Sequence, residues 1–151
     1  MPIYRNNQLR KGRYSEPGRI YILTTVVKNR APVFADFKLG RCLVRELINT
    51  QLWNQAQSLA WVIMPDHLHW LVQLQDAPLA TLANQIKSRS ARAINRQRGC
   101  LGPMWQSGFH DRALRRDEDL AAAARYIVAN PIRAGLVQRV GDYPLWDAVW
   151  V

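Results

Sequence analysis

The chain has 151 residues, 48% of them hydrophobic, which is enough for one globular domain with a buried core. Its formal net charge of +10 and its pI of about 10.4 favour nucleic acid or an anionic membrane surface as a partner, although a basic face that only serves solubility would give the same composition. No stretch reaches the roughly 18 apolar residues of a membrane span, and Cys42 and Cys100 form neither a CxxC pair nor a disulfide framework, so we expect a cytoplasmic protein with no membrane partner.

The first 30 residues are strongly basic, with seven lysines and arginines against one acid, Glu16. We predict that residues 1–17 form a basic arm that contacts phosphates, followed by a core over 18–138 and a tail over 139–151. A disordered arm that only keeps the protein in solution would have the same composition. The candidate contacts at this end of the chain are Arg10, Lys11, Arg13 and Arg19.

The next segments predict a strand, a helix and a hairpin. Residues 19–27 (RIYILTTVV) are rich in β-branched and aromatic side chains, which is typical of a strand. Apolar residues at helical spacing predict a helix over 36–51. A second strand over 59–64 is joined to a third over 67–75 by a Pro-Asp turn, so these two strands form a hairpin.

A ridge of one charge sign marks the helix predicted over residues 78–98. Its apolar residues form one stripe, and the neighbouring stripe carries Arg89, Arg92 and Arg96. No acid occurs between residues 77 and 110, whereas a helix stabilised by surface salt bridges would mix both signs. The ridge therefore favours contact with phosphates, with a plain solvated face as the alternative.

The last predicted elements are a strand over residues 104–114 and a helix over 117–130. The order β-α-β-β-α-β, followed by a helix, matches a ferredoxin-like α+β domain with a four-stranded antiparallel sheet and helices packed on one face. The other face would stay open for a ligand, and the C-terminal helix is additional. RNA-binding RRM domains share this order, but their [KR]-G-[FY]-[GA]-F-V-x-[FY] signature is absent.

Two histidines share one side of the strand over 67–75, because alternate side chains of a strand point the same way. Imidazoles placed as in His67 and His69 can converge on one metal ion, although partly buried polar residues or chance explain such pairs more often. A third ligand has to come from elsewhere, and an amide or carboxylate oxygen suits that role. Tyr126 and Asn130, four residues apart on the C-terminal helix, are expected together on one face at the edge of the core.

Taken together, these segments resemble the REP-associated tyrosine transposases of the HUH single-strand transposase superfamily. The resemblance is carried by GRYSEPGRIYILTT, WVIMPDHLHWLV, MWQSGFHDRALRRDEDL and YIVANPIRAGLV, which span nearly the whole chain in the expected order. Its most specific feature is HLH on a strand, followed about sixty residues later by Tyr-x-x-x-Asn-Pro.

The resemblance implies a DNA nicking and joining enzyme that acts on single-stranded DNA with palindromic hairpins, as a monomer or a homodimer. His67 and His69 would bind a divalent metal, Mg²⁺ or Mn²⁺, with Asn130 as the third ligand. Tyr126 would be the nucleophile and form a 5′-phosphotyrosine intermediate. No GxxxxGK[ST] loop is present, in agreement with chemistry that uses no nucleotide cofactor. Binding to DNA would associate the protein with the nucleoid.

Basic and aromatic side chains are the expected DNA contacts. The candidates are Arg10, Lys11, Arg13, Arg19, Arg89, Arg92, Arg96, Trp105 and Arg133. Trp105 and Phe109 are expected as stacking platforms for bases, with burial in the core as the alternative. Arg125 or Arg133 could instead stabilise a phenolate that forms during attack. Two rival functions remain, a non-catalytic RRM-like module and a domesticated relative that binds hairpin DNA without cutting it.

Overall fold

A computed structural model describes residues 18–52, 56–115 and 118–149 of the chain. The predicted basic arm, with Arg10, Lys11 and Arg13, lies outside the described residues. Within the described ranges, no helix combines the length and the apolar character needed to cross a membrane.

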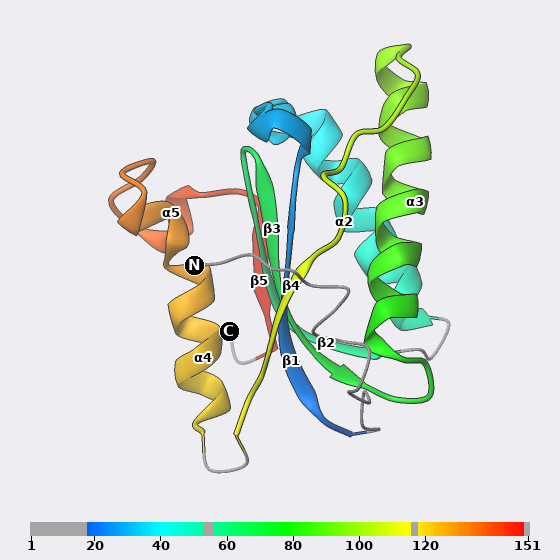
Figure 1. Cartoon of the computed structure of the whole chain (residues 1–151). Coiled ribbons are helices and arrows are strands. Elements are labelled where there is room, and N and C mark those ends of the chain that lie inside the picture. Colours follow the sequence, from blue (N-terminus) through cyan, green and yellow to red (C-terminus); the bar gives the residue numbers. More distant parts are fainter. Residues whose placement is uncertain (1–17, 53–55, 116–117, 150–151) are drawn as a thin grey trace.

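The described residues form an antiparallel sheet of five strands in the order β4-β1-β3-β2-β5 (Figure 1). The strands are β1 (Ile20–Val26), β2 (Ala56–Met64), β3 (His67–Leu74), β4 (His110–Ala113) and β5 (Trp146–Ala148). The first four are the predicted strands, so the predicted α+β class and antiparallel sheet are confirmed. β4 is shorter than predicted, because the segment before it pairs only through an isolated bridge between Val27 and Trp105.

Two helices, α2 (Phe37–Leu52) and α3 (Leu79–Arg98), pack on one face of the sheet, as predicted (Figure 1). This face receives Leu68, Trp70 and Val72, the alternate side chains of β3, and all three are fully buried. Burying such apolar side chains contributes about 1.5–3 kcal/mol each, so this layer forms the main core. The helices thereby fix the direction in which the opposite side chains of β3 must point.

The opposite face of the sheet is covered in part by α4 (Leu120–Val128) and the short α5 (Asn130–Arg133) (Figure 1). α4 buries Ala124, Ile127 and Val128 in a second apolar cluster with side chains of β2 and β3. The prediction that this face stays open is therefore wrong where α4 lies. The reason is that both the helix and the sheet carry apolar side chains here, and packing against each other buries both sets of side chains away from water.

The helix predicted over 117–130 is two helices. α4 begins at Leu120 because the carboxylate of Asp119 accepts hydrogen bonds from two backbone N–H groups of the first turn, at 3.0 and 3.2 Å. Pro131 has no N–H to donate to a preceding turn, and it lies in the first turn of α5, where none is needed. The helix is therefore interrupted at Ala129, between Tyr126 and Asn130.

The fifth strand corrects the prediction of a four-stranded sheet. β5 pairs with residues 60–62 of β2, so the C-terminal segment packs back on the domain. Tyr143 donates its hydroxyl to the carbonyl of Ile63 at 2.6 Å and holds the segment before β5. Gly40 of α2 makes room for Leu145, because a Cβ at Gly40 would lie 2.5 Å from a methyl carbon of that leucine.

Candidate functional site

His67 and His69 lie on the sheet face that α4 covers in part. Met64 pairs with His67 and Val62 with His69 across the β2–β3 hairpin, and both partners belong to the apolar cluster under α4. The two imidazole rings meet edge to face, with their centroids 4.7 Å apart. The neighbouring imidazoles predicted from the sequence are therefore present.

Hydrogen bonds fix the inner nitrogen of both rings. Nδ1 of His67 lies 2.6 Å from Oδ1 of Asp66, and Nδ1 of His69 lies 2.8 Å from the hydroxyl oxygen of Thr24. Engaged Nδ1 atoms leave Nε2 as the nitrogen that can bind another group, which is the usual arrangement of metal-binding histidines. The pair therefore suits a divalent cation held by two Nε2 atoms.

The protonation states of His69 and Asp66 favour binding of a cation. Burial lowers the pKa of His69 to about 3, and nearby positive charges, including Arg133, act in the same direction. Burial opposes the ionisation of Asp66, but hydrogen bonds from His67 and Arg30 outweigh it and hold the pKa of this carboxyl below its ordinary value. At neutral pH the site thus combines a neutral imidazole with a carboxylate, and a metal would displace no proton from His69.

Tyr126 lies on α4 and 65% of it is exposed, so its ring can be reached from outside the molecule. The guanidinium of Arg133 stacks on its ring, with Cζ 3.8 Å from the ring centroid. The same arginine contributes to the low pKa of His69. Arg133 therefore links the phenol of α4 electrostatically to the histidine pair.

Asn130 is half-buried and opens α5, one turn beyond Tyr126. Among the described residues, no group of three or more His, Cys, Asp or Glu side chains is placed to hold a metal ion. Asn130 carries an amide oxygen, a neutral group of the kind that can bind such an ion, on the helix that follows the tyrosine.

His110, the third histidine, was not predicted to belong to the site. Strand pairing opposes both His110 of β4 and His69 of β3 to Thr24 of β1, so the three residues form a row on one face of the sheet. Burial lowers the pKa of His110. The predicted ferredoxin-like strand order, which puts the first strand between the third and the fourth, was the signal that could have revealed this row.

The basic ridge consists of Arg89, Arg92 and Arg96. It belongs to α3, which lies on the other side of the sheet from α4, so the ridge and the histidines do not share a face (Figure 1). Arg92 and Arg96 are exposed and Arg89 is half-buried. Lys87 ties α3 to the segment that leads into β4, because its Nζ donates to two backbone carbonyls there at 2.8 and 2.6 Å.

Two predicted DNA contacts have partners inside the fold. Trp105 is only 7% exposed, and its indole N–H donates to the hydroxyl of Ser90 at 3.0 Å. Its ring belongs to the core, so of the two alternatives for Trp105 the structure favours burial over a stacking platform. Phe109 also packs against this core and is partly buried. The Nε of Arg19 donates to the carbonyl of Leu114 at 3.2 Å and joins the chain before β1 to the end of β4.

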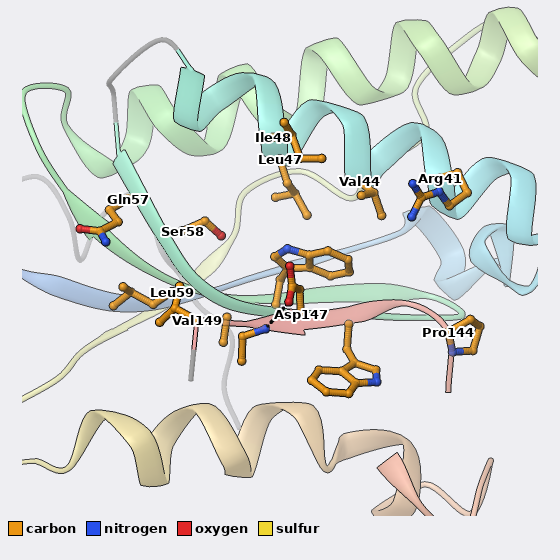
Figure 2. A pocket seen from close by; sticks show the side chains of 14 residues that line it. Arg41, Val44, Leu47, Ile48, Gln57, Ser58, Leu59, Pro144, Asp147 and Val149 are labelled. Atoms are coloured by element: carbon orange, nitrogen blue, oxygen red, sulfur yellow. Dashed lines mark hydrogen bonds between the residues drawn. The ribbon is translucent and has the colours of Figure 1, made fainter. Parts of the chain in front are cut away.

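A cavity of about 480 Å³ lies away from the histidines, beside α2 at the β5 edge of the sheet (Figure 2). Apolar side chains such as Val44 and Leu59 form much of its wall. Arg41 and Asp147 are the ionisable side chains that line it. Because neither a nucleophile with a base nor a metal-ligand pair faces this cavity, we place the candidate site at the histidine pair instead.

Comparison with known proteins gives a family match and relatives. A family model described as IS200-like transposase matches residues 18–130. A REP-associated tyrosine transposase of Escherichia coli (strain K12) is 26% identical over 134 residues, which cover 87% of this chain and 78% of the relative. A second relative, from Haemophilus influenzae, is 33% identical over 99 residues, which cover 58% of this chain and 56% of the relative.

Among solved structures, a REP-associated tyrosine transposase bound to a REP hairpin superposes with a TM-score of 0.74. It shares 25% sequence identity, and the match covers 97% of this chain and 82% of that protein. The similarity therefore extends over the sheet, both helical layers and the C-terminal segment.

Proposed function

Because the chain belongs to the family of IS200-like transposases, we propose that it cuts and rejoins single-stranded DNA at palindromic repeats that fold into hairpins. The resemblance to REP-associated tyrosine transposases is confirmed, and with it a DNA nicking and joining enzyme. The relative that is bound to a REP hairpin supports hairpin DNA as the substrate class. A protein that acts on chromosomal repeats would work in the cytoplasm, associated with the nucleoid.

We propose that Nε2 of His67 and Nε2 of His69 hold a divalent cation, Mg²⁺ or Mn²⁺, with the side-chain oxygen of Asn130 as a third ligand. The engaged Nδ1 atoms and the neutral state of His69 support this assignment. When bound, the cation would withdraw charge from a non-bridging oxygen of the scissile phosphodiester and orient that group.

Tyr126 is the proposed nucleophile. Its oxygen would attack phosphorus, a bond from phosphorus to the tyrosine would form, and the bond to the 3′-oxygen would break, leaving a 3′-hydroxyl and a 5′-phosphotyrosine. A phenol is mostly protonated at neutral pH, so the attack needs removal of a proton or positive charge near the oxygen. The guanidinium of Arg133, stacked on the ring, is suited to stabilise the phenolate. The phosphotyrosine keeps an ester that another 3′-hydroxyl can attack, so rejoining needs no nucleotide cofactor.

The observation that supports this function most directly is the shared location of the histidine pair and the helix that carries Tyr126, on one side of the sheet. The decisive experiment incubates the purified protein with Mn²⁺ and a single-stranded oligonucleotide that carries an inverted repeat from the DNA flanking the gene. We expect a covalent protein–DNA adduct that survives denaturation. Tight binding without any adduct would contradict strand cleavage and identify a domesticated hairpin binder.

The basic ridge is proposed to bind the DNA backbone. A DNA strand that contacts both the ridge and the histidines has to pass an edge of the sheet. The β4 edge is the one next to the ridge helix, because α3 is tied to the segment that leads into β4. The basic residues proposed as further DNA contacts are Arg10, Lys11, Arg13, Arg19 and Arg133.

Removing charge from the ridge is expected to weaken binding in a salt-dependent way. Log affinity falls as log salt rises, and Arg92→Ala combined with Arg96→Ala should make this slope shallower by about 1.4 to 1.8. Each phosphate contact contributes about 0.7 to 0.9 to the steepness, through the counterions that are released on binding. Arg41→Ala combined with Arg45→Ala removes the same charge from exposed positions on α2 and serves as the matched control. Fluorescence anisotropy at several salt concentrations measures both slopes, and equal slopes would contradict a role of the ridge.

A non-catalytic RRM-like function has less support. In that fold, bases stack on aromatic side chains of an open sheet face. Here the corresponding face carries histidines on β3 and is partly covered by α4. RNA that binds far more tightly than hairpin DNA at equal salt would favour this alternative.

Whether the protein acts as a monomer or a homodimer is a separate question, which the molar mass of the DNA complex would answer.

A further inference from the structure

Asp66 connects His67 to an arginine from another part of the chain. We infer that Asp66 and Arg30 form a positioning pair that fixes the tautomer and the orientation of His67. The inference rests on the proposed function for its effect on DNA cleavage, whereas the contact itself can be tested without metal or DNA.

Each oxygen of the Asp66 carboxylate has one partner. Oδ1 lies 2.6 Å from Nδ1 of His67, and Oδ2 accepts a hydrogen bond from Nη1 of Arg30 at 3.0 Å. A carboxylate can only accept, so Nδ1 of His67 must carry a hydrogen, and in the neutral imidazole the lone pair is then on Nε2. Two fixed contacts on one carboxylate also prevent its rotation, and the imidazole plane is held with it.

The backbone around this pair does not depend on the side chain of Asp66. The carbonyl of Asp66 accepts from the N–H of Val27, and the carbonyl of Pro65 accepts from the N–H of Phe34, both at 2.9 Å. These bonds hold the β2–β3 turn against the segment that follows β1. Removing the carboxylate should therefore leave the turn in place and change only the contacts of His67 and Arg30.

The segment that carries Arg30 is held in an unfavourable conformation. Asn29 and Arg30 have φ angles of 59° and 51°, in the left-handed region where residues with a Cβ are uncommon. The backbone is anchored just before them, because Lys28 donates to the carbonyl of Met104 at 2.9 Å. Strain of this kind persists only where the surroundings impose it, and here it accompanies an arginine whose guanidinium reaches Asp66.

The two histidines are thereby made unequal. His69 pairs with the neutral hydroxyl of Thr24, whereas His67 pairs with a charged carboxylate that an arginine holds in place. A carboxylate on Nδ1 makes the Nε2 lone pair of the same ring more basic. His67 should therefore be the stronger ligand of the pair.

The contact is tested by ¹⁵N NMR of the imidazole nitrogens in the metal-free protein. In the parent protein we expect His67 to hold its hydrogen on Nδ1, and in Asp66→Ala we expect its signals to move toward a mixture of tautomers. Asp142→Ala removes an exposed carboxylate that pairs with Arg139 and should leave His67 unchanged. The amide signals of Val27 and Phe34 report whether the turn remains folded. An unchanged His67 tautomer in a folded Asp66→Ala protein would overturn the inference.

Metal affinity provides a second readout. Calorimetric titration with Mn²⁺ should show about 10- to 100-fold weaker binding for Asp66→Ala than for the parent protein. This is the usual effect of removing a carboxylate that hydrogen-bonds to a metal-binding histidine. Asp66→Asn keeps an acceptor for Nδ1 but loses the charge, so it should retain the tautomer and bind Mn²⁺ with intermediate affinity. Arg30→Ala should weaken binding less than Asp66→Ala. Equal affinity in all four proteins would contradict the positioning role.

Failure of the proposed function and failure of the positioning pair give different results. If the tautomer shifts in Asp66→Ala but the parent protein forms no adduct with hairpin DNA, the proposed function is wrong and the positioning pair stands. If the adduct forms but the tautomer of His67 does not depend on Asp66, the function stands and the positioning pair is wrong.

Discussion

Replacement of Tyr126 by phenylalanine is expected to abolish the covalent protein–DNA adduct while hairpin binding stays within about twofold of the parent value. The substitution removes the oxygen that would bond to phosphorus, and loss of a nucleophile typically lowers turnover by about 10³-fold or more. The phenyl ring can still stack under the guanidinium of Arg133, so the helix and the arginine should keep their positions. Adduct formation is measured by denaturing gel electrophoresis with labelled DNA, and binding by anisotropy.

Tyr143→Phe is the matched control, because it deletes a hydroxyl from another tyrosine of the described chain. That hydroxyl donates to the carbonyl of Ile63, so its loss should cost about 1 kcal/mol of stability without preventing adduct formation. An adduct that persists in Tyr126→Phe would remove this tyrosine as the nucleophile. Loss of the adduct in both variants would point to damaged folding rather than to chemistry.

His67→Ala and His69→Ala are each expected to reduce cleavage by at least about 100-fold with little change in DNA affinity. Each variant removes one of two imidazoles from the proposed cation site, and the charge stabilisation that a cation supplies to the scissile phosphate is worth several kcal/mol. DNA affinity should persist because the proposed contacts to the DNA backbone lie elsewhere, on the ridge and other basic residues. Adduct formation across a Mn²⁺ titration, with a chelator as the zero point, measures the effect.

Gln73→Ala is the control for these two variants. Gln73 lies on the same strand and face as His69, four residues farther along β3, and its amide donates to the carbonyl of Gly18 at 3.0 Å. We expect it to cleave like the parent protein. Cleavage that is unchanged in His67→Ala, or that needs no divalent metal, would contradict the two-histidine site.

Much of the fold could be predicted because its long elements carry clear periodicity. The helices predicted over 36–51 and 78–98 and the hairpin around the Pro-Asp turn are observed within a few residues of the predicted bounds. β5 could not be predicted, because its three residues show no usable alternation and become a strand only by pairing with β2. The break between α4 and α5 was missed as well, because a proline such as Pro131 is typical both of the segment after a helix and of the first turn of a new one.

The site could be predicted in part. Alternation along a strand was sufficient to place His67 and His69 side by side, since that geometry is local. The contact of Arg30 with Asp66 joins two residues that are 36 positions apart in the sequence, so no local sequence pattern predicts it. Trp105 was assigned to DNA because exposure cannot be read from a single aromatic residue, and its hydrogen-bond partner, Ser90, lies on another element. The role of Tyr126 stays a prediction that Tyr126→Phe tests, and the role of Asn130 stays a prediction.

The two borders of the sheet are short, with four residues in β4 and three in β5. A long unpaired strand border exposes a row of N–H and C=O groups on which another molecule can assemble, and this is a common origin of aggregation. Without β5, the nine-residue strand β2 would be such a border. By pairing with residues 60–62 of β2, the C-terminal segment covers part of the border that this long strand would otherwise expose.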